Sequence, residues 1–262
     1  MDTYVQHLLQ RSEIRYTDAR ALVPDPPARL WSPGHTGKTR RMTGTAAQVT
    51  EETTAQGRST REDWLNLALQ TLIRDGIDRV KIQIMAKQLN VSRSSFYWFF
   101  KSPQDLYEQM LDHWLTKNTG PIIQRALRPA ATISEAILNV FECWVDEDLF
   151  DPHLDIAVRL WARRAPTVLK VVESADQQRL DALTGMFRRH GFAEVDALVR
   201  ARVLYFTQIG QYTLDLREDL ALRLSRTRAY LQAFGAAEPT AKELARFEGL
   251  VIATAKAVKP QV

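Results

Sequence analysis

The apolar positions from about residue 60 onward recur with helical spacing, and no run of alternating β-branched residues competes with that pattern. Trp64, Ala68 and Leu72 stand four residues apart, which places them on one face of a first helix. That helix is predicted to end at Gly76, because glycine is common just beyond a helix C-terminus. The pattern as a whole predicts an all-α fold.

Two shorter helices and a linking helix are predicted to follow within residues 58–117. The second helix is expected to end near Asn90, where a turn leads into the third. Ser92 is expected to cap the third helix, because its hydroxyl can accept a backbone N–H two or three residues on. Ser102 and Pro103 then open a fourth helix with a capping serine and a proline at the first helical position. The very short connection between the second and third helices is typical of a helix-turn-helix.

Prolines and glycines divide residues 118–262 into further helices, which predicts a larger helical domain after the first. The helix predicted at residues 193–216 has two apolar stripes instead of one. A helix that is apolar on two sides is expected to be buried on two sides. The first stripe consists of Val195, Val199, Val203, Phe206 and Gly210, and the second of Ala201, Leu204, Tyr205 and Tyr212.

Residues 1–57 have a different composition from the rest of the chain, since they hold four of its eleven prolines and several threonine and glycine runs. Such a segment buries little apolar surface, so we expect it to be disordered. The predicted organisation is therefore a tail at residues 1–57, a helix-turn-helix domain with its linking helix at residues 58–117, and a helical domain at residues 118–262.

The composition excludes several classes of protein. With 45% apolar and 25% charged residues among 262, the chain resembles a globular protein. It has no apolar run long enough to span a membrane and no signal-peptide pattern at its N-terminus, so we expect a cytoplasmic protein without a membrane partner. The single cysteine, Cys143, excludes an intrachain disulfide and a multi-cysteine zinc site. The net charge of +4 is too small to indicate nucleic-acid binding by itself.

The residues of the predicted third helix nevertheless suit DNA. In a helix-turn-helix this helix lies in the major groove, with its N-terminal residues at the base edges. Arg93, Ser94 and Ser95 occupy that position, and arginine bound to guanine is the commonest specific contact. Tyr97 and Trp98 follow with a hydroxyl and an indole N–H that can reach phosphate oxygens.

Residues 61–115 resemble the DNA-binding domain of the tetracycline-repressor (TetR) family of bacterial transcriptional regulators. The resemblance rests on residues in the order and spacing of the family's signature, namely Ala68, Gly76, Met85-Ala86, Val91-Ser92, Phe96-Tyr97-Trp98-Phe99-Phe100 and Leu106. It implies a homodimeric regulator, most often a repressor in this family, that binds a palindromic operator in double-stranded DNA and is released by a small-molecule effector. It implies no cofactor.

Four residues depart from the family pattern. Lys81 stands where a capping threonine or serine is usual, and Asn90 where a turn glycine is usual. Phe99 stands where many members have a histidine, and Pro103 where a lysine is common. Lys81 can still contact a phosphate, and Lys101 can supply charge near the fourth helix. The expected DNA contacts are Lys81, Ser92, Arg93, Ser94, Ser95, Tyr97, Trp98 and Lys101. The departures also leave an alternative, a helical ligand- or partner-binding protein whose DNA-binding unit is degenerate.

The larger domain is expected to hold the effector and the dimer interface. The candidate pocket residues are aromatic side chains at helical spacing, a pattern that also suits ordinary core packing; they are Phe141, Trp144, Trp161, Phe187 and Phe206. The pocket is expected within the helices at residues 132–149, 151–163 and 165–190. The stripe of Ala201, Leu204, Tyr205 and Tyr212 is expected at the dimer interface, together with one of the last two helices, because it is too apolar to face water.

An enzymatic function is not expected. His153 lies near Asp151 and Asp155, but no nucleophile, glycine-rich loop or second histidine at metal-ligand spacing accompanies it. The sequence therefore predicts neither catalytic residues nor a metal site.

Overall fold

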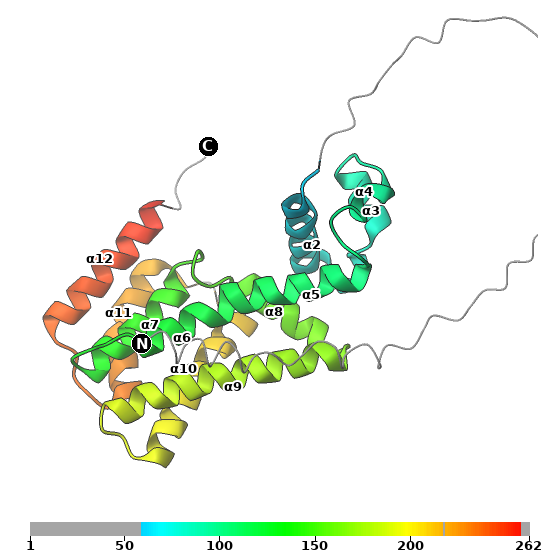
Figure 1. The fold of residues 1–262 in the computed structure, drawn as a ribbon. Helices are drawn as coiled ribbons and strands as arrows, with labels where there is room; N and C mark the ends of the chain where they lie inside the picture. Colours follow the sequence, from blue (N-terminus) through cyan, green and yellow to red (C-terminus); the bar gives the residue numbers. More distant parts are fainter. Residues whose placement is uncertain (1–58, 217, 258–262) are drawn as a thin grey trace, which may run out of the picture. The chain divides into compact units, whose positions relative to one another are not determined.

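The computed structural model describes residues 59–216 and 218–257, and every regular element in those ranges is a helix (Figure 1). This confirms the predicted all-α fold with an N-terminal helix-turn-helix. The tail predicted at residues 1–57 lies outside the described residues.

The N-terminal helices form the helix-turn-helix around one buried aromatic pair. They are α2 (Arg61–Asp75), the short 3-10 turn η2 (Ile77–Arg79), α3 (Ile82–Gln88) and α4 (Arg93–Phe96). Thr60 and Asp63 form a capping box at the start of α2, which satisfies two backbone N–H groups there. Trp64 is fully buried and meets the edge of Phe96 at a ring-centroid distance of 5.3 Å. Asn90 has φ of 54°, which confirms the predicted turn.

A long helical segment leads away from this unit. It consists of α5 (Pro103–Trp114), the π-helical turn η3 (Leu115–Thr119) and α6 (Gly120–Leu127). The Ser102 hydroxyl accepts the backbone N–H of Asp105 at 3.2 Å, and Pro103 is the first helical residue, as predicted. The π-helical turn was not predicted from the sequence.

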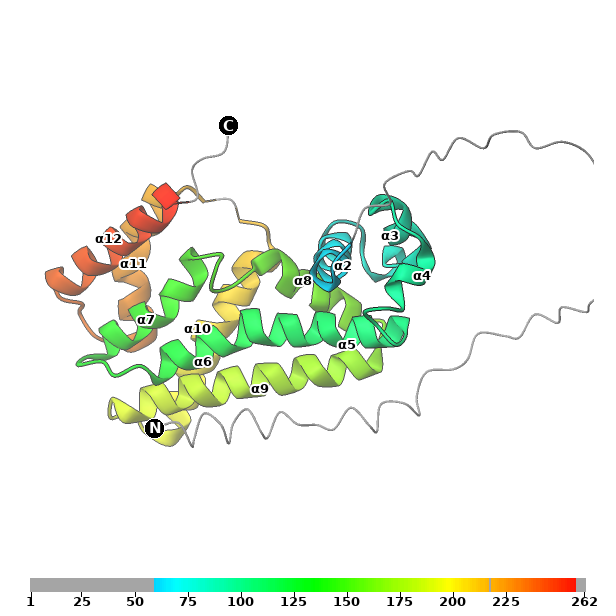
Figure 2. The same ribbon diagram turned by 45° about the horizontal axis from the view of Figure 1, so that its top comes forward.

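Six further helices complete the described chain. They are α7 (Ile133–Val145), α8 (Pro152–Ala162), α9 (Pro166–Arg189), α10 (Glu194–Thr213), α11 (Leu220–Gly235) and α12 (Ala241–Ala257). The long helix α9 packs against α6, α8 and α10, and both views show it beside α6 (Figures 1 and 2). Helices α11 and α12 pack on α7.

The buried apolar residues fall into two clusters. One joins the helix-turn-helix to α5, α8 and the first half of α9, and it includes Trp161. The other lies among α6, α7, α9, α10, α11 and α12. Helix α8 therefore packs with the DNA-binding unit, although it lies beyond residue 117 in the sequence.

A buried network of charged and polar groups lies where α5, η3, α8, α9 and α10 meet. Arg179 of α9 is fully buried, and its guanidinium donates to the Asp155 carboxylate at 3.2 Å and the Tyr205 hydroxyl at 2.7 Å. It also donates twice to the Thr119 hydroxyl, and it lies 5.0 Å from the centroid of the Trp114 ring. The Trp114 indole N–H donates to Asp155 at 2.9 Å.

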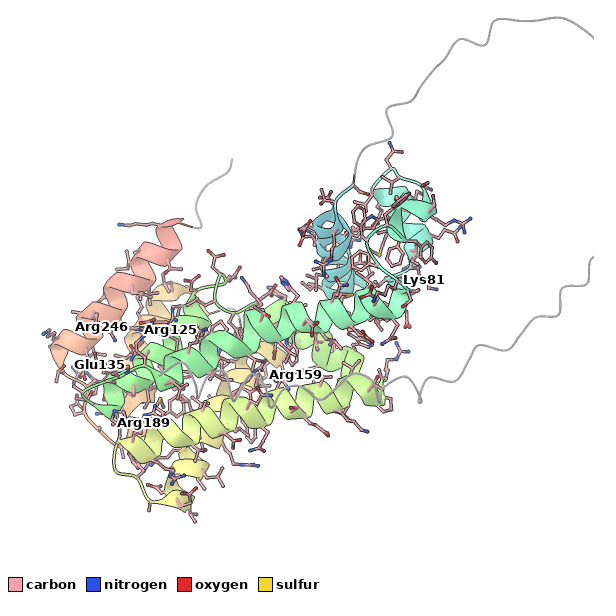
Figure 3. All side chains as sticks on the ribbon, in the orientation of Figure 1. Lys81, Arg125, Glu135, Arg159, Arg189 and Arg246 are labelled. Carbon is pink, nitrogen blue, oxygen red and sulfur yellow. The ribbon has the colours of Figure 1, made fainter. Side chains whose placement is uncertain are left out.

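Arg159 provides a second cation for the same network. Arg159, labelled in Figure 3, reaches from α8 to α9. There it forms a bidentate pair with Asp176 at 2.6 and 2.8 Å, and it donates to Asp155 at 2.7 Å. Burial alone raises the pKa of Asp155, but Arg179 and Arg159 outweigh it, so the pKa lies below the usual value of an aspartate.

We expect Asp155→Asn to lower the free energy of unfolding by about 3 to 5 kcal/mol, because it removes the charge that compensates two arginines, one of them fully buried. Because folding depresses the pKa of Asp155, its contribution is present above about pH 4 and is lost as the pH falls through the folded-state value. Urea denaturation at a series of pH values should therefore show a loss of stability in acid that is smaller in the variant. Glu173→Gln, which neutralises an exposed carboxylate on α9, is the control. An unchanged denaturation midpoint for Asp155→Asn would contradict the role given to this network.

Candidate functional site

Helix α4 and the turn that follows it present polar and aromatic side chains on the surface of the helix-turn-helix. Phe96 and Phe100 are buried and stack at a centroid distance of 5.0 Å, which holds the short helix against the core. Tyr97 is 58% exposed and Trp98 is 84% exposed. The side chain of Arg93 is also exposed and forms no ion pair with another described residue. An exposed tryptophan of this kind has no packing role within the chain, so it is available for a contact outside it.

The predicted cap at Ser92 is wrong in its chemistry. Ser92 occupies the position before α4, but its hydroxyl bonds to the Ser94 hydroxyl at 2.8 Å and accepts no backbone N–H. The Ser95 hydroxyl donates back to the Ser92 carbonyl at 2.7 Å. Helix α4 is only four residues long, so the serines bond to one another and to the carbonyl instead of capping a long helix.

Two lysines flank this surface. Lys81 (Figure 3) precedes α3 without a side-chain capping bond, and its neighbour Val80 accepts a hydrogen bond from Tyr107 of α5. Lys101 is exposed, and its backbone N–H donates to the Asp105 carboxylate at 2.8 Å. Neither ammonium group has an ion pair within the described part of the chain. Both are therefore free to meet phosphate.

A cavity of about 60 Å³ lies among α7, α10, α11 and α12, so α7 is the one helix of the three expected to form the pocket that lines this cavity. Phe141 and Trp144 line it together with residues of α10, α11 and α12. Gln208 also lines it, and its buried amide interacts with the Tyr212 hydroxyl. Apolar cavities of about 150 Å³ can hold benzene, so this cavity must widen to admit a molecule of that size.

The other three expected pocket residues lie elsewhere. Trp161 packs in the cluster of the DNA-binding unit, where it meets the edge of Tyr107 at 5.6 Å. Phe187 is fully buried against Phe192. Phe206 is 45% exposed, with Arg202 stacked 4.9 Å from its ring centroid. Helical spacing correctly indicated aromatic residues that face inward in α7, α8 and α9, but it did not show that they face different clusters.

The stripe expected at a dimer interface is on the inside of the chain. Ala201, Leu204 and Tyr205 are at most 2% exposed, because they pack against the rest of the same chain, and Tyr212 stacks on Phe150 at 5.6 Å. The assignment of those residues to the interface is therefore corrected. The exposed face of α10 is formed instead by the other stripe and its neighbour, namely Val195, Leu198, Val199, Val203 and Phe206.

Within residues 59–216 and 218–257, no group of three or more histidine, cysteine, aspartate or glutamate side chains is placed to hold a metal ion. Asp151 and Asp155 already have structural partners, since Asp151 caps α8 and Asp155 binds Arg179.

In the same ranges no helix is both long and apolar enough to cross a bilayer. Burial raises the pKa of Cys143 to about 12, which keeps this thiol protonated and unreactive at neutral pH.

An exposed recognition surface on a helix-turn-helix, followed by a larger helical region, defines the class of DNA-binding transcriptional regulators. Residues 65–110 match the family model of bacterial regulatory proteins of the tetR family. Residues 65–110 are therefore similar to the DNA-binding domain of that family, and this match supports a DNA-binding transcriptional regulator.

The comparison with solved structures gives matches of low sequence identity. Salmonella enterica GusR is 15% identical with a TM-score of 0.47, and the match covers 75% of this chain and 95% of that one. A TetR transcriptional regulator from Legionella pneumophila is 14% identical with a TM-score of 0.49, over 77% and 98% of the two chains. A tetR-family regulator from Streptomyces coelicolor is 17% identical with a TM-score of 0.47, over 74% and 88%.

The two serines before α4 and α5 should differ in their effect on stability. Ser102→Ala removes a side-chain bond to a backbone N–H and should lower the free energy of unfolding by about 1 kcal/mol. Ser92→Ala removes only an exposed bond between two hydroxyls, so its effect should stay within about 0.5 kcal/mol. Chemical denaturation of both variants measures the difference. Equal losses would mean that Ser92 caps α4 in solution.

Proposed function

We propose that the chain is a cytoplasmic homodimeric repressor that binds a palindromic operator and is released from it by a small-molecule effector. The observation that supports DNA binding most directly is the surface at residues 92–98. An arginine without an ion pair among the described residues begins α4, the helix that reads DNA in this class, and two exposed aromatic side chains follow directly after it.

The proposed contacts divide by function. Arg93, with Ser94 beside it, would meet base edges in the major groove, since the start of the recognition helix lies deepest there. Tyr97 and Trp98 follow it and would contact the backbone with the hydroxyl and the indole N–H. The flanking ammonium groups of Lys81 and Lys101 would meet phosphates. In a dimer, two such helices would read half-sites spaced by about 34 to 36 Å or a multiple of it.

Arg93→Ala should weaken binding to the best operator by about 1 to 3 kcal/mol and relax the preference at the base pair that it reads. Lys101→Ala should weaken binding to all sequences alike and reduce the salt dependence of the affinity, because it loses only a phosphate contact. Selection of binding sites from random duplexes, followed by titrations at several salt concentrations, measures both effects. The absence of any enriched sequence for the wild-type protein would favour the alternative of a degenerate DNA-binding unit.

The exposed stripe of α10 is the proposed dimer surface. Val199 and Val203 are about half exposed, at 51% and 48%, on a helix whose opposite side is buried in the chain. Several adjacent apolar side chains on one helix face are typical of an interface between subunits. A second helix, α11 or α12, would complete the interface, and both carry an exposed aliphatic residue, Leu222 and Ile252.

Val203→Glu should convert the dimer into monomers, since it places one charge from each subunit in an apolar interface. Leu160→Glu is the matched control, because Leu160 is similarly exposed but lies on α8, away from the stripe. Sedimentation equilibrium distinguishes the two variants. Dimers that persist in Val203→Glu at micromolar concentration would place the interface on another face.

The effector is proposed to be a small apolar or aromatic molecule bound in the cavity among α7, α10, α11 and α12. Phe141 and Trp144 provide aromatic walls, and the Gln208 amide provides a polar group beside them. Release from DNA requires that the effector bind the DNA-free conformation more tightly, typically by about 1 to 3 kcal/mol. Because α10 and α11 also provide the exposed faces proposed for the dimer, widening the cavity would alter the distance between the two DNA-reading helices.

A further inference from the structure

A second hollow, separate from the interior cavity, lies between the C-terminal end of α2 and helix α8. It is a groove of about 530 Å³, and residues of α2, η2 and α8 line it. Its volume lies within the range of about 300 to 1,000 Å³ that is typical of small-molecule sites. The groove therefore lies between the DNA-binding unit and a helix of the region that follows it in the chain.

The floor of the groove is apolar. Seven of its lining side chains are aliphatic or aromatic, and Trp161 is the largest of them. Two of the seven are partly exposed to water, since Leu160 is 55% exposed and Ile73 is 37% exposed. They come from different helices and line the same groove, so a single apolar chain laid along it would cover both.

The charged groups of the groove are all basic. Arg74, Arg163 and Arg164 line it, with His153, and no acidic residue does. Arg74 and Arg164 have exposed partners, Asp75 and Asp78, at 2.8 and 2.7 Å. Arg163 is exposed and has no ion pair with another described residue. A free guanidinium thus stands one helical turn or less from the exposed Leu160.

We infer that this groove binds an amphipathic anion, a molecule with a carboxylate or phosphate head and an unbranched apolar tail. The head would pair with Arg163, whose planar guanidinium suits either anion, and the tail would cover Leu160 and Ile73. A purely apolar molecule would leave the arginines unused, and a small inorganic anion would leave the apolar floor in water. The combination of the two features selects the amphipathic anion.

Occupancy of the groove acts on DNA binding. The Arg164–Asp78 pair links the end of α8 to η2, directly beside the helix-turn-helix. An anionic head beside Arg164 competes with Asp78 for that guanidinium, and the tail separates or clamps α2 and α8. Either change shifts the orientation of the recognition helix, so the ligand and the operator are coupled.

The experiment uses the full chain without DNA and four probes: octanoate, octyl phosphate, 1-octanol and inorganic phosphate. Calorimetric titration should show saturable binding of octanoate or octyl phosphate with one site per chain, and at least about tenfold weaker binding of the other two. The stronger of the two amphiphiles identifies the preferred head group. Equal affinity for inorganic phosphate, or for 1-octanol, would overturn the inference.

Variants test the place of binding. Arg163→Gln should weaken binding of the preferred amphiphile about tenfold, and Leu160→Glu should weaken it more than Leu160→Gln, because only the former adds a repelling charge. Arg188→Gln, an exposed arginine on α9 far from the groove in the sequence, is the control. Thermal denaturation verifies that each variant is folded. Unchanged affinity in folded Arg163→Gln and Leu160→Glu would place the ligand elsewhere.

The coupling is measured separately with operator DNA. A saturating amphiphile should change the operator affinity of the wild-type protein by about fivefold or more and leave that of Leu160→Glu unchanged. No change in the wild-type protein, despite proven binding in the groove, would overturn the coupling. Because ligand binding is measured without DNA, failure of the proposed DNA-binding function would not be mistaken for failure of the groove.

Discussion

The arrangement of the helices depends on the need to compensate one fully buried cation, Arg179. A guanidinium without water must have its donors satisfied and its charge balanced, since an unpaired buried charge is among the most destabilising features a fold can have. Asp155, Tyr205 and Thr119 meet this need from three different elements. Each of them is buried in turn, so the positions of α8, α9, α10 and η3 are determined together and not pair by pair. The π-helical turn at η3 ends at Thr119, the residue that accepts twice from Arg179.

The same network determines what α8 can do. Near its start α8 contributes Asp155 to the network, and near its end it contributes Trp161 to the cluster beneath the helix-turn-helix. Helix α10 contributes Tyr205 to the network with one face and leaves an apolar stripe exposed on another. The proposed dimer surface and the DNA-binding unit are thus connected by contiguous contacts through the buried polar network. Two sites are coupled when the elements between them can adopt two arrangements and binding at each site shifts the equilibrium between these arrangements.

Local features of the fold were predictable from the sequence, and features decided by packing were not. The cap at Ser102 and the turn at Asn90 follow from the chemistry of one or two residues, and both were confirmed. Ser92 has the same chemistry, but the neighbouring serines offer competing partners, so composition alone did not decide its bond. The two stripes of α10 were recognised, yet periodicity cannot tell which stripe faces the interior. The stripe that contains Tyr205 faces the interior because the Tyr205 hydroxyl accepts a hydrogen bond from the buried Arg179. The spacing of apolar residues does not reveal a buried arginine, so the polar network around Arg179 was not predicted.

The DNA-binding surface depends on the core beneath it to an unusual degree. Helix α4 has only four residues, too few to be stable by its own hydrogen bonds, so tertiary packing must hold it. Phe96 provides that packing, because its ring meets Trp64, Phe100 and Tyr97 at 5.3, 5.0 and 5.2 Å. Tyr97 is therefore oriented by a buried ring although it is itself exposed. With 9 basic and 7 acidic residues in the sequence from 58 to 117, the unit has little general attraction for DNA. Its affinity must come from a few well-placed groups, and the aromatic core is what holds those groups in place.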